Sequence, residues 1–121
     1  MAAARKGYRS LDVWQRAMEL VEAVYKVTQL LPDSERFGLI SQMQRAAVSA
    51  PSNIAEGYGR GGRDYRRFVV MARGSVMELE TQFEITVRLK LLSREEIREA
   101  WDLSQGTAKM LSRLADSLKG R

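Results

Sequence analysis

The chain of 121 residues contains no cysteine and no histidine. Without cysteine it can form neither a disulfide framework nor a thiolate zinc site. Without histidine it lacks the side chain that most often acts as a general base or binds a transition metal. Any bound metal would be a hard cation held by carboxylates. We therefore expect no cofactor, no metal site and no enzymatic activity.

Prolines and long apolar runs are also scarce. The longest uninterrupted apolar stretch covers residues 68–72, which is too short to span a membrane. The basic N-terminal segment lacks the apolar run of a signal peptide. The sequence thus predicts a cytoplasmic protein that makes no contact with a membrane.

What the chain does have is positive charge and enough apolar residues for a core. Twenty Lys and Arg residues against fifteen Asp and Glu give a net charge of +5, which favours a polyanionic partner such as RNA or DNA. Hydrophobic residues make up 45% of the chain, so a packed core is expected rather than disorder. The length fits one domain.

Apolar residues recur every three or four positions, the spacing of amphipathic helices. The predicted helices cover about 11–31, 34–57, 63–91 and 93–119, within a bundle over 10–119 that follows a flexible basic arm over 1–9. Pro32 ends the first helix, and Pro51 predicts a kink in the second. Ser93 and Glu96 form a capping-box pattern at the start of the fourth. The fold class is therefore all-α, an up-down-up-down four-helix bundle.

A basic cluster at the start of the third helix is the strongest local signal. Five arginines and a single acid, Asp64, lie between residues 60 and 73. The arginines are Arg60, Arg63, Arg66, Arg67 and Arg73. Helical spacing puts Arg63 and Arg67 opposite the apolar stripe, and Arg66 and Arg73 on one flank. Guanidinium groups and a helix N-terminus both bind phosphate, so we predict nucleic-acid binding here, with a merely solvated face as the alternative.

Residues around this cluster add to the predicted nucleic-acid surface. Tyr58 can stack on a base, and Arg5, Lys6 and Arg9 form a basic arm. The glycines of Gly57–Gly62 resemble a nucleotide-binding motif, but no strand precedes them and no Walker lysine follows. We interpret this segment as a flexible turn between helices.

Acidic pairs on the predicted helices raise the possibility of a carboxylate-metal hydrolase. Glu19 and Glu22 lie on the first helix, and Glu80 and Glu84 lie on the third. A magnesium-dependent hydrolase would need such pairs to face one another across helices. The further acids, on the fourth helix, are Glu96, Glu99 and Asp102. We interpret all of these acids as parts of solvated faces.

A second apolar set suggests self-association. On the first helix we predict that Trp14, Met18 and Tyr25 belong to the stripe that faces the core. The apolar residues left outside the predicted core are Val13, Leu20 and Val27 on the first helix, and Val70 and Met77 on the third. Gly74 lies on the same outer side and would let another backbone approach closely. Several such residues in register predict a subunit contact.

Three stretches, Leu11–Gln15, Gln44–Gly57 and Ala72–Gln82, resemble the bacterial four-helix-bundle proteins first seen as 23S rRNA intervening-sequence proteins. The resemblance covers about residues 8–118. It implies a bundle that assembles as a homopentameric ring, without catalytic residues. It also implies kinship with the accessory variability proteins of diversity-generating retroelements, which are pentameric barrels that bind nucleic acid and a reverse transcriptase.

Two functional hypotheses follow. The leading one is a non-enzymatic, oligomeric nucleic-acid-binding bundle, with RNA as the expected partner, whose basic outer face contacts phosphates without reading bases. The alternative is a structural or adaptor ring that binds another protein, such as a reverse transcriptase.

Overall fold

The computed structural model describes residues 7–120, and these residues form helices and turns with no β-strand. The four long helices are α1 (Asp12–Thr28), α2 (Ser41–Arg60), α3 (Gly62–Arg88) and α4 (Arg94–Ser117). Three shorter turns of helix precede α1 and α2: η1 (Gly7–Ser10), η2 (Asp33–Glu35) and the wider turn η3 (Arg36–Ile40). The all-α prediction is confirmed.

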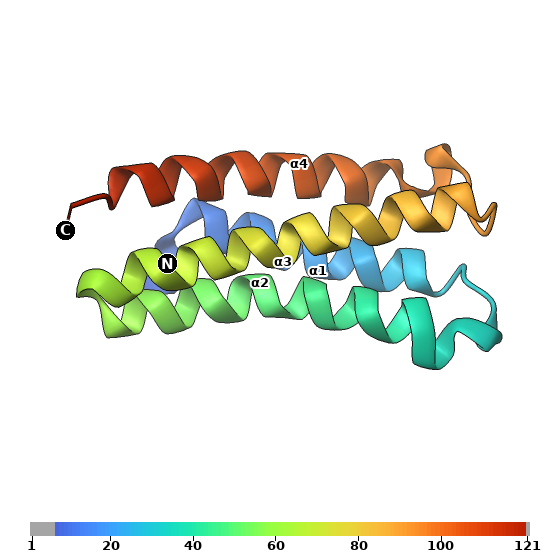
Figure 1. Ribbon diagram of the computed structural model, residues 1–121, viewed down its shortest axis with the longest axis horizontal. Helices are drawn as coiled ribbons and strands as arrows, with labels where there is room; N and C mark the ends of the chain where they lie inside the picture. Colours follow the sequence, from blue (N-terminus) through green and yellow to red (C-terminus); the bar gives the residue numbers. More distant parts are fainter. Residues whose placement is uncertain (1–6, 121) are drawn as a thin grey trace, which may run out of the picture.

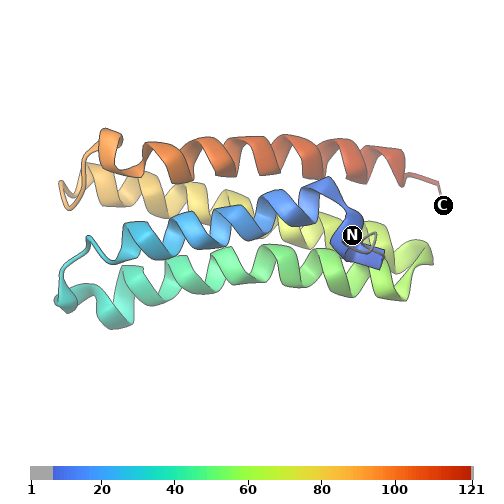
Figure 2. The same ribbon diagram turned by 180° about the vertical axis from the view of Figure 1, so that it is seen from behind.

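The long helices pack side by side, and each runs antiparallel to the one before it (Figure 1). The view from behind shows α1 lying between α2 and α4 (Figure 2). Contacts join α1 to α2 and α4, and α3 to the same two helices, so α1 and α3 lie on opposite corners. The α2–α3 connection is at one end of the bundle, and the α1–α2 and α3–α4 connections are at the other.

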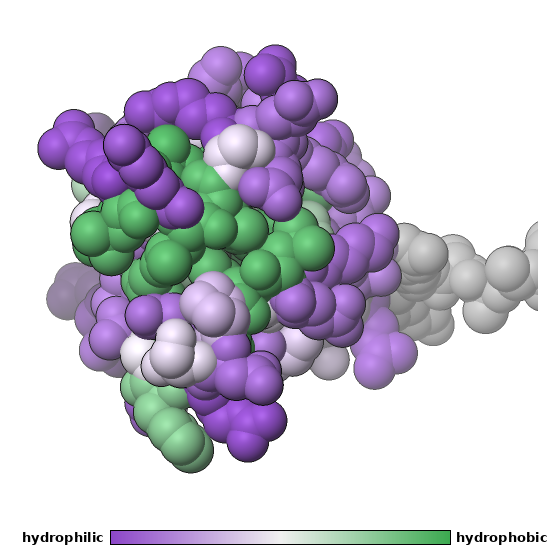
Figure 3. Space-filling view, turned by 90° about the vertical axis from the view of Figure 1, so that its right-hand side faces the viewer, coloured by the Kyte–Doolittle hydropathy of each residue, from purple (hydrophilic) through white to green (hydrophobic). Residues whose placement is uncertain are grey.

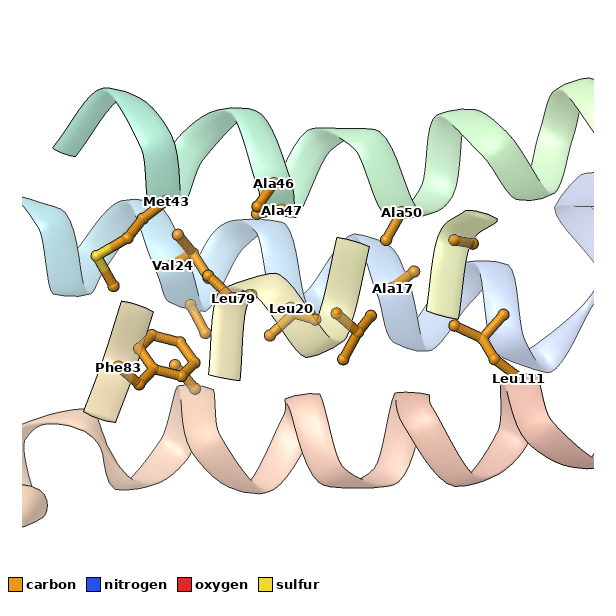
Figure 4. Packing of buried hydrophobic residues seen from close by; sticks show 14 of the residues in the cluster. Ala17, Leu20, Val24, Met43, Ala46, Ala47, Ala50, Leu79, Phe83 and Leu111 are labelled. Atoms are coloured by element: carbon orange, nitrogen blue, oxygen red, sulfur yellow. The ribbon is translucent and has the colours of Figure 1, made fainter. Parts of the chain in front are cut away.

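One apolar core fills the space between the four helices. Its three largest fully buried side chains come from three helices: Leu20 from α1, Met43 from α2 and Phe83 from α3. Ala46, Ala47 and Ala50 lie along the buried side of α2, where short side chains let the neighbouring helices approach (Figure 4). Burial of this kind stabilises a fold by about 25 cal/mol per Å² of apolar area.

The predicted orientation of the first helix is wrong in part. Val13, Leu20 and Val27 are buried in the core, so none of them is available to a partner. Met18 and Tyr25 are instead exposed, and Trp14 is half-buried at the margin of the core. Apolar residues cover about half of this helix, so periodicity alone allowed two orientations, and packing against α2 and α4 selected one.

The ends of α2 also differ from the prediction. Residues 34–40 form the turns η2 and η3 rather than α-helix, and Gly38 has non-helical angles (φ −109°, ψ −111°). At the other end, α2 continues to Arg60, and Gly61 (φ 68°) is the single residue between α2 and α3. The predicted flexible turn is therefore a tight break that relies on glycine's access to positive φ. Pro51 lies inside one helix, and the kink stays a prediction.

Three residues of the predicted flexible arm lie in a short turn of helix. Residues Gly7–Ser10 form η1, and the Tyr8 ring packs edge-on against Trp14 with 5.3 Å between centroids. Arg5 and Lys6 lie outside the described residues. In contrast, the capping box is confirmed: the Ser93 hydroxyl accepts from the Glu96 amide at 3.1 Å, and the Ser93 amide donates to the Glu96 carboxylate at 2.9 Å. Within residues 7–120, no helix has the length and hydropathy needed to cross a membrane.

The corrected orientation of α1 can be tested by two equivalent truncations. Leu20→Ala removes a fully buried side chain, so we expect it to lower the free energy of unfolding by about 2–5 kcal/mol. Leu89→Ala, at a residue that is 61% exposed, should change it by less than about 0.5 kcal/mol. Urea denaturation at one protein concentration measures both. Equal effects would contradict the burial of Leu20.

Candidate nucleic-acid interface

The five arginines predicted to bind nucleic acid differ in their neighbours. Arg60 and Arg67 both pair with Asp64, each at 3.4 Å, and Arg60 also pairs with Glu56 at 3.2 Å. The hydrogen bonds to Glu56 and then Asp64 raise the pKa of Arg60 above its ordinary value. Both guanidinium groups lie over the Phe68 ring, at 5.1 and 5.0 Å from its centroid. Their charge is therefore partly neutralised by neighbours.

Arg63 and Arg66 have different surroundings. Arg63 is exposed, and no ion pair in the part of the chain from 7 to 120 includes it. Arg66 is half-buried, and its Nε donates to the Ala115 carbonyl at 3.0 Å. This bond crosses from α3 to the last turn of α4, where the same carbonyl also accepts from the Leu118 amide at 3.2 Å. Arg66 thus fastens α3 to α4, on the flank where the sequence places it.

Arg73, on the same flank, lines a groove between α3 and α4. Lys109 and Arg113 of α4 line it too, so three cations from two helices meet there. None of the three belongs to an ion pair among the residues that the structure describes. The groove has a volume of about 370 Å³, and its remaining lining residues are Met77, Glu80, Gln105, Ala108 and Ser112.

Sequence reasoning missed Lys109 and Arg113. Their separation of four residues puts them on one face of a helix, which was the available signal. The spacing did not show which other helix lies beside this face of α4. The structure supplies this by placing Arg73 opposite them across the groove.

Glu80 is the one acid in this groove. Its side chain is half-buried, and burial raises the pKa of its carboxyl, an effect that the neighbouring Gln105 amide opposes. Glu80 takes part in no ion pair within residues 7–120, although it shares the groove with three cations. The groove therefore offers hydrogen-bond donors and an acceptor side by side.

The other predicted nucleic-acid contacts are more peripheral. Tyr58 is partly exposed and meets Tyr65 edge-on, with 5.6 Å between ring centroids. Arg9 is exposed in η1, with its guanidinium 6.0 Å from the centre of the Tyr8 ring. Neither residue lines the α3/α4 groove.

The predicted oligomer residues of α3 are more exposed than those of α1. Val70 is half-buried against the core, Gly74 is exposed, and Met77 lines the α3/α4 groove. Another groove, of about 660 Å³, is lined by three exposed apolar residues, Tyr25 of α1, Phe37 of η3 and Val48 of α2. Hydrophobic residues also gather at the end of the bundle that carries the α1–α2 and α3–α4 connections (Figure 3).

Four of the acids considered for a metal site meet in a different groove. Glu19 and Glu22 of α1 line it together with Glu99 and Asp102 of α4, but so do Arg16 and Lys26. Arg16 pairs with Glu19 at 3.5 Å. In the described residues, no three carboxylates are placed so that they could hold a metal ion.

Comparison with known proteins identifies the family. Residues 9–113 match the 23S rRNA-intervening sequence proteins. The chain belongs to this family. The match reaches into all four long helices of the chain and includes every residue of the α3/α4 groove. No curated protein shows significant similarity to the chain.

A solved structure shares the fold of this family member. It is a Bacteroides thetaiotaomicron protein of unknown function from the S23 ribosomal protein family, and it superposes with a TM-score of 0.78 at 21% sequence identity. The similarity covers 88% of this chain and 98% of the other. At this identity the comparison supports the fold alone.

Two glycines of α2 test how closely α2 and α3 approach near the arginine cluster. A Cβ at Gly57 would lie 2.6 Å from the Phe68 Cβ, whereas a Cβ at Gly59 would have no neighbour within 4 Å. We expect Gly57→Ala to lower the free energy of unfolding by about 1–3 kcal/mol. Gly59→Ala should leave it unchanged or raise it by up to about 1 kcal/mol. Thermal denaturation measures both, and equal stability of the two variants would contradict the close contact.

Proposed function

We propose that this protein binds RNA through the α3/α4 groove and catalyses no reaction. The observation that carries the proposal is the meeting of Arg73, Lys109 and Arg113 in one groove, with no acid paired to any of them in the described structure. Arginine and lysine side chains in such an arrangement bind phosphate groups. The family name, which refers to 23S rRNA, supports RNA as the polyanion.

The placement of the other cations supports this choice of surface. Arg60 and Arg67 already interact with carboxylates, so a phosphate would have to compete with Asp64 and Glu56. Arg66 lies on the same flank as Arg73 and extends the basic strip along the α3/α4 boundary. Arg63 and Tyr58, at the nearby α2–α3 end, are further contacts for a longer strand.

Removal of the groove cations should weaken RNA binding more than removal of the same charge elsewhere. We expect the triple variant Arg73→Ala, Lys109→Ala, Arg113→Ala to bind a single-stranded RNA at least tenfold more weakly. The slope of log affinity against log salt should also become shallower by about 0.7 for each phosphate that the variant no longer neutralises. Fluorescence anisotropy at several salt concentrations measures both quantities.

The matched control is Arg16→Ala, Lys26→Ala, Arg88→Ala, which removes three charges from other surfaces. Circular dichroism verifies that both triple variants are folded. If the affinity of the two variants falls equally, net charge rather than the groove is responsible. If the natural protein binds no RNA at low salt, the proposed function is wrong.

Self-association belongs to the same proposal, with a homopentameric ring as the expected assembly. The surface that supports it is the α1/α2 face rather than the face predicted from the sequence. Met18, Tyr25 and Val48 are each 37–42% exposed there, and Phe37 is 92% exposed at its end. Apolar residues grouped on one face of a small domain are typical of subunit contacts.

Charge placed on this face should break the oligomer. We expect Met18→Glu with Val48→Glu to reduce the mass measured by light scattering to that of a single chain, because the subunit contact would bury two new carboxylates among apolar side chains. Ile85→Glu, at a similarly exposed residue of α3, should leave the mass unchanged. A natural protein that is already a monomer at micromolar concentration would contradict the proposed assembly.

The alternative function is an adaptor ring that binds a protein, such as a reverse transcriptase. The apolar end of the bundle favours it, since Leu30, Phe37 and Leu89 are all more than half exposed there. Absence of RNA binding together with an intact oligomer would favour this alternative.

A further inference from the structure

We infer that the α3/α4 groove selects guanine in single-stranded nucleic acid, through the side chains of Glu80 and Gln105. The inference rests on the proposed RNA binding and adds which base the site reads. It assigns a role to the two polar residues of the groove that phosphate binding does not use.

A groove that served only phosphate would be weakened by a carboxylate. Glu80 nevertheless lies in the same groove as Arg73, Lys109 and Arg113, and it pairs with none of them. Its oxygens therefore remain acceptors for a ligand that carries N–H donors. A nucleotide has both parts, because its phosphate accepts hydrogen bonds and its base presents donors.

The chemistry of a carboxylate distinguishes guanine from the other bases. Guanine presents two adjacent donors, N1–H and the N2 amino group, which match the two oxygens of a carboxylate. Adenine and cytosine present one amino group beside a ring-nitrogen acceptor, and uracil presents one N–H between two carbonyls. Each of these would place an acceptor against a carboxylate oxygen of Glu80, with no hydrogen bond to offset the repulsion.

Gln105 completes the complement to guanine. Its side chain lines the same groove as Glu80. A Gln amide carries two N–H donors, so one can bond Glu80 while the other faces the guanine O6 acceptor. An amide and a carboxylate side by side thus present a donor next to two acceptors. This is the inverse of the guanine edge.

The remaining lining suits a base rather than a second phosphate. Met77 and Ala108 give the groove an apolar surface on which a ring can lie, and Met77 is 57% exposed. The groove of about 370 Å³ is open to solvent and has room for a base. In a duplex the N1–H and N2 groups of guanine are already paired, so the site requires an unpaired base.

The test compares two RNA 12-mers, one of uridine alone and one in which isolated guanosines are spaced through uridine so that they form no quadruplex. We expect the natural protein to bind the guanosine-containing RNA about tenfold more tightly, the discrimination of one good bidentate base contact. Glu80→Gln should abolish this preference. It should also raise the affinity for the uridine RNA, because a negative charge leaves the groove.

Glu78→Gln is the matched control. It removes an acid from the same helix, but Glu78 lines a different groove, between α2 and α3. It should leave the preference intact. A second probe replaces guanosine by inosine, which lacks the N2 amino group, and most of the preference should then disappear.

The outcomes separate the two proposals. If Glu80→Gln strengthens binding of both RNAs equally, Glu80 only repels phosphate, and the guanine inference is overturned while RNA binding stands. The guanine inference is also overturned if the preference for the guanosine-containing RNA persists in Glu80→Gln or when inosine replaces guanosine. If the natural protein binds neither RNA, the proposed function and the inference both fail.

Discussion

Burial of one continuous apolar seam between four antiparallel helices is the interaction on which the rest of the structure depends. Leu20, Met43 and Phe83 come from three different helices and are fully buried together. Their burial fixes the rotation of each helix about its own axis. That rotation then decides which side chains face a neighbouring helix, a groove or solvent, so the surface chemistry is a consequence of the core.

The α3/α4 groove shows this dependence most clearly. Arg73 is far from Lys109 and Arg113 in the chain, and the three meet only because α3 and α4 pack side by side. The bond from Arg66 to the Ala115 carbonyl ties the two helices together near one end. In the arginine-rich start of α3, Arg60 and Arg67 both pair with Asp64, so their charge is partly neutralised. The more widely spaced cations of the α3/α4 groove have no such acidic partner in the described structure and can bind a ligand.

Much of the fold could be predicted because helix-forming signals are local. Apolar spacing, the capping box at Ser93 and the break near Gly61 depend on residues a few positions apart. The face of α1 that is buried could not be predicted in the same way. Its apolar arc includes both Leu20 and Met18, and only contact with other helices distinguishes them. The same limit hid Lys109 and Arg113, whose role depends on a residue of another helix.

The sequence by itself determined an all-helical domain, its four long helices, its positive charge and the absence of thiol and imidazole chemistry. Each of these follows from composition or from short-range periodicity. Only the tertiary structure decided which apolar residues form the core and which cations share a groove with Glu80. The physical reason is that helix rotation and helix pairing are settled by long-range packing, which no local pattern contains.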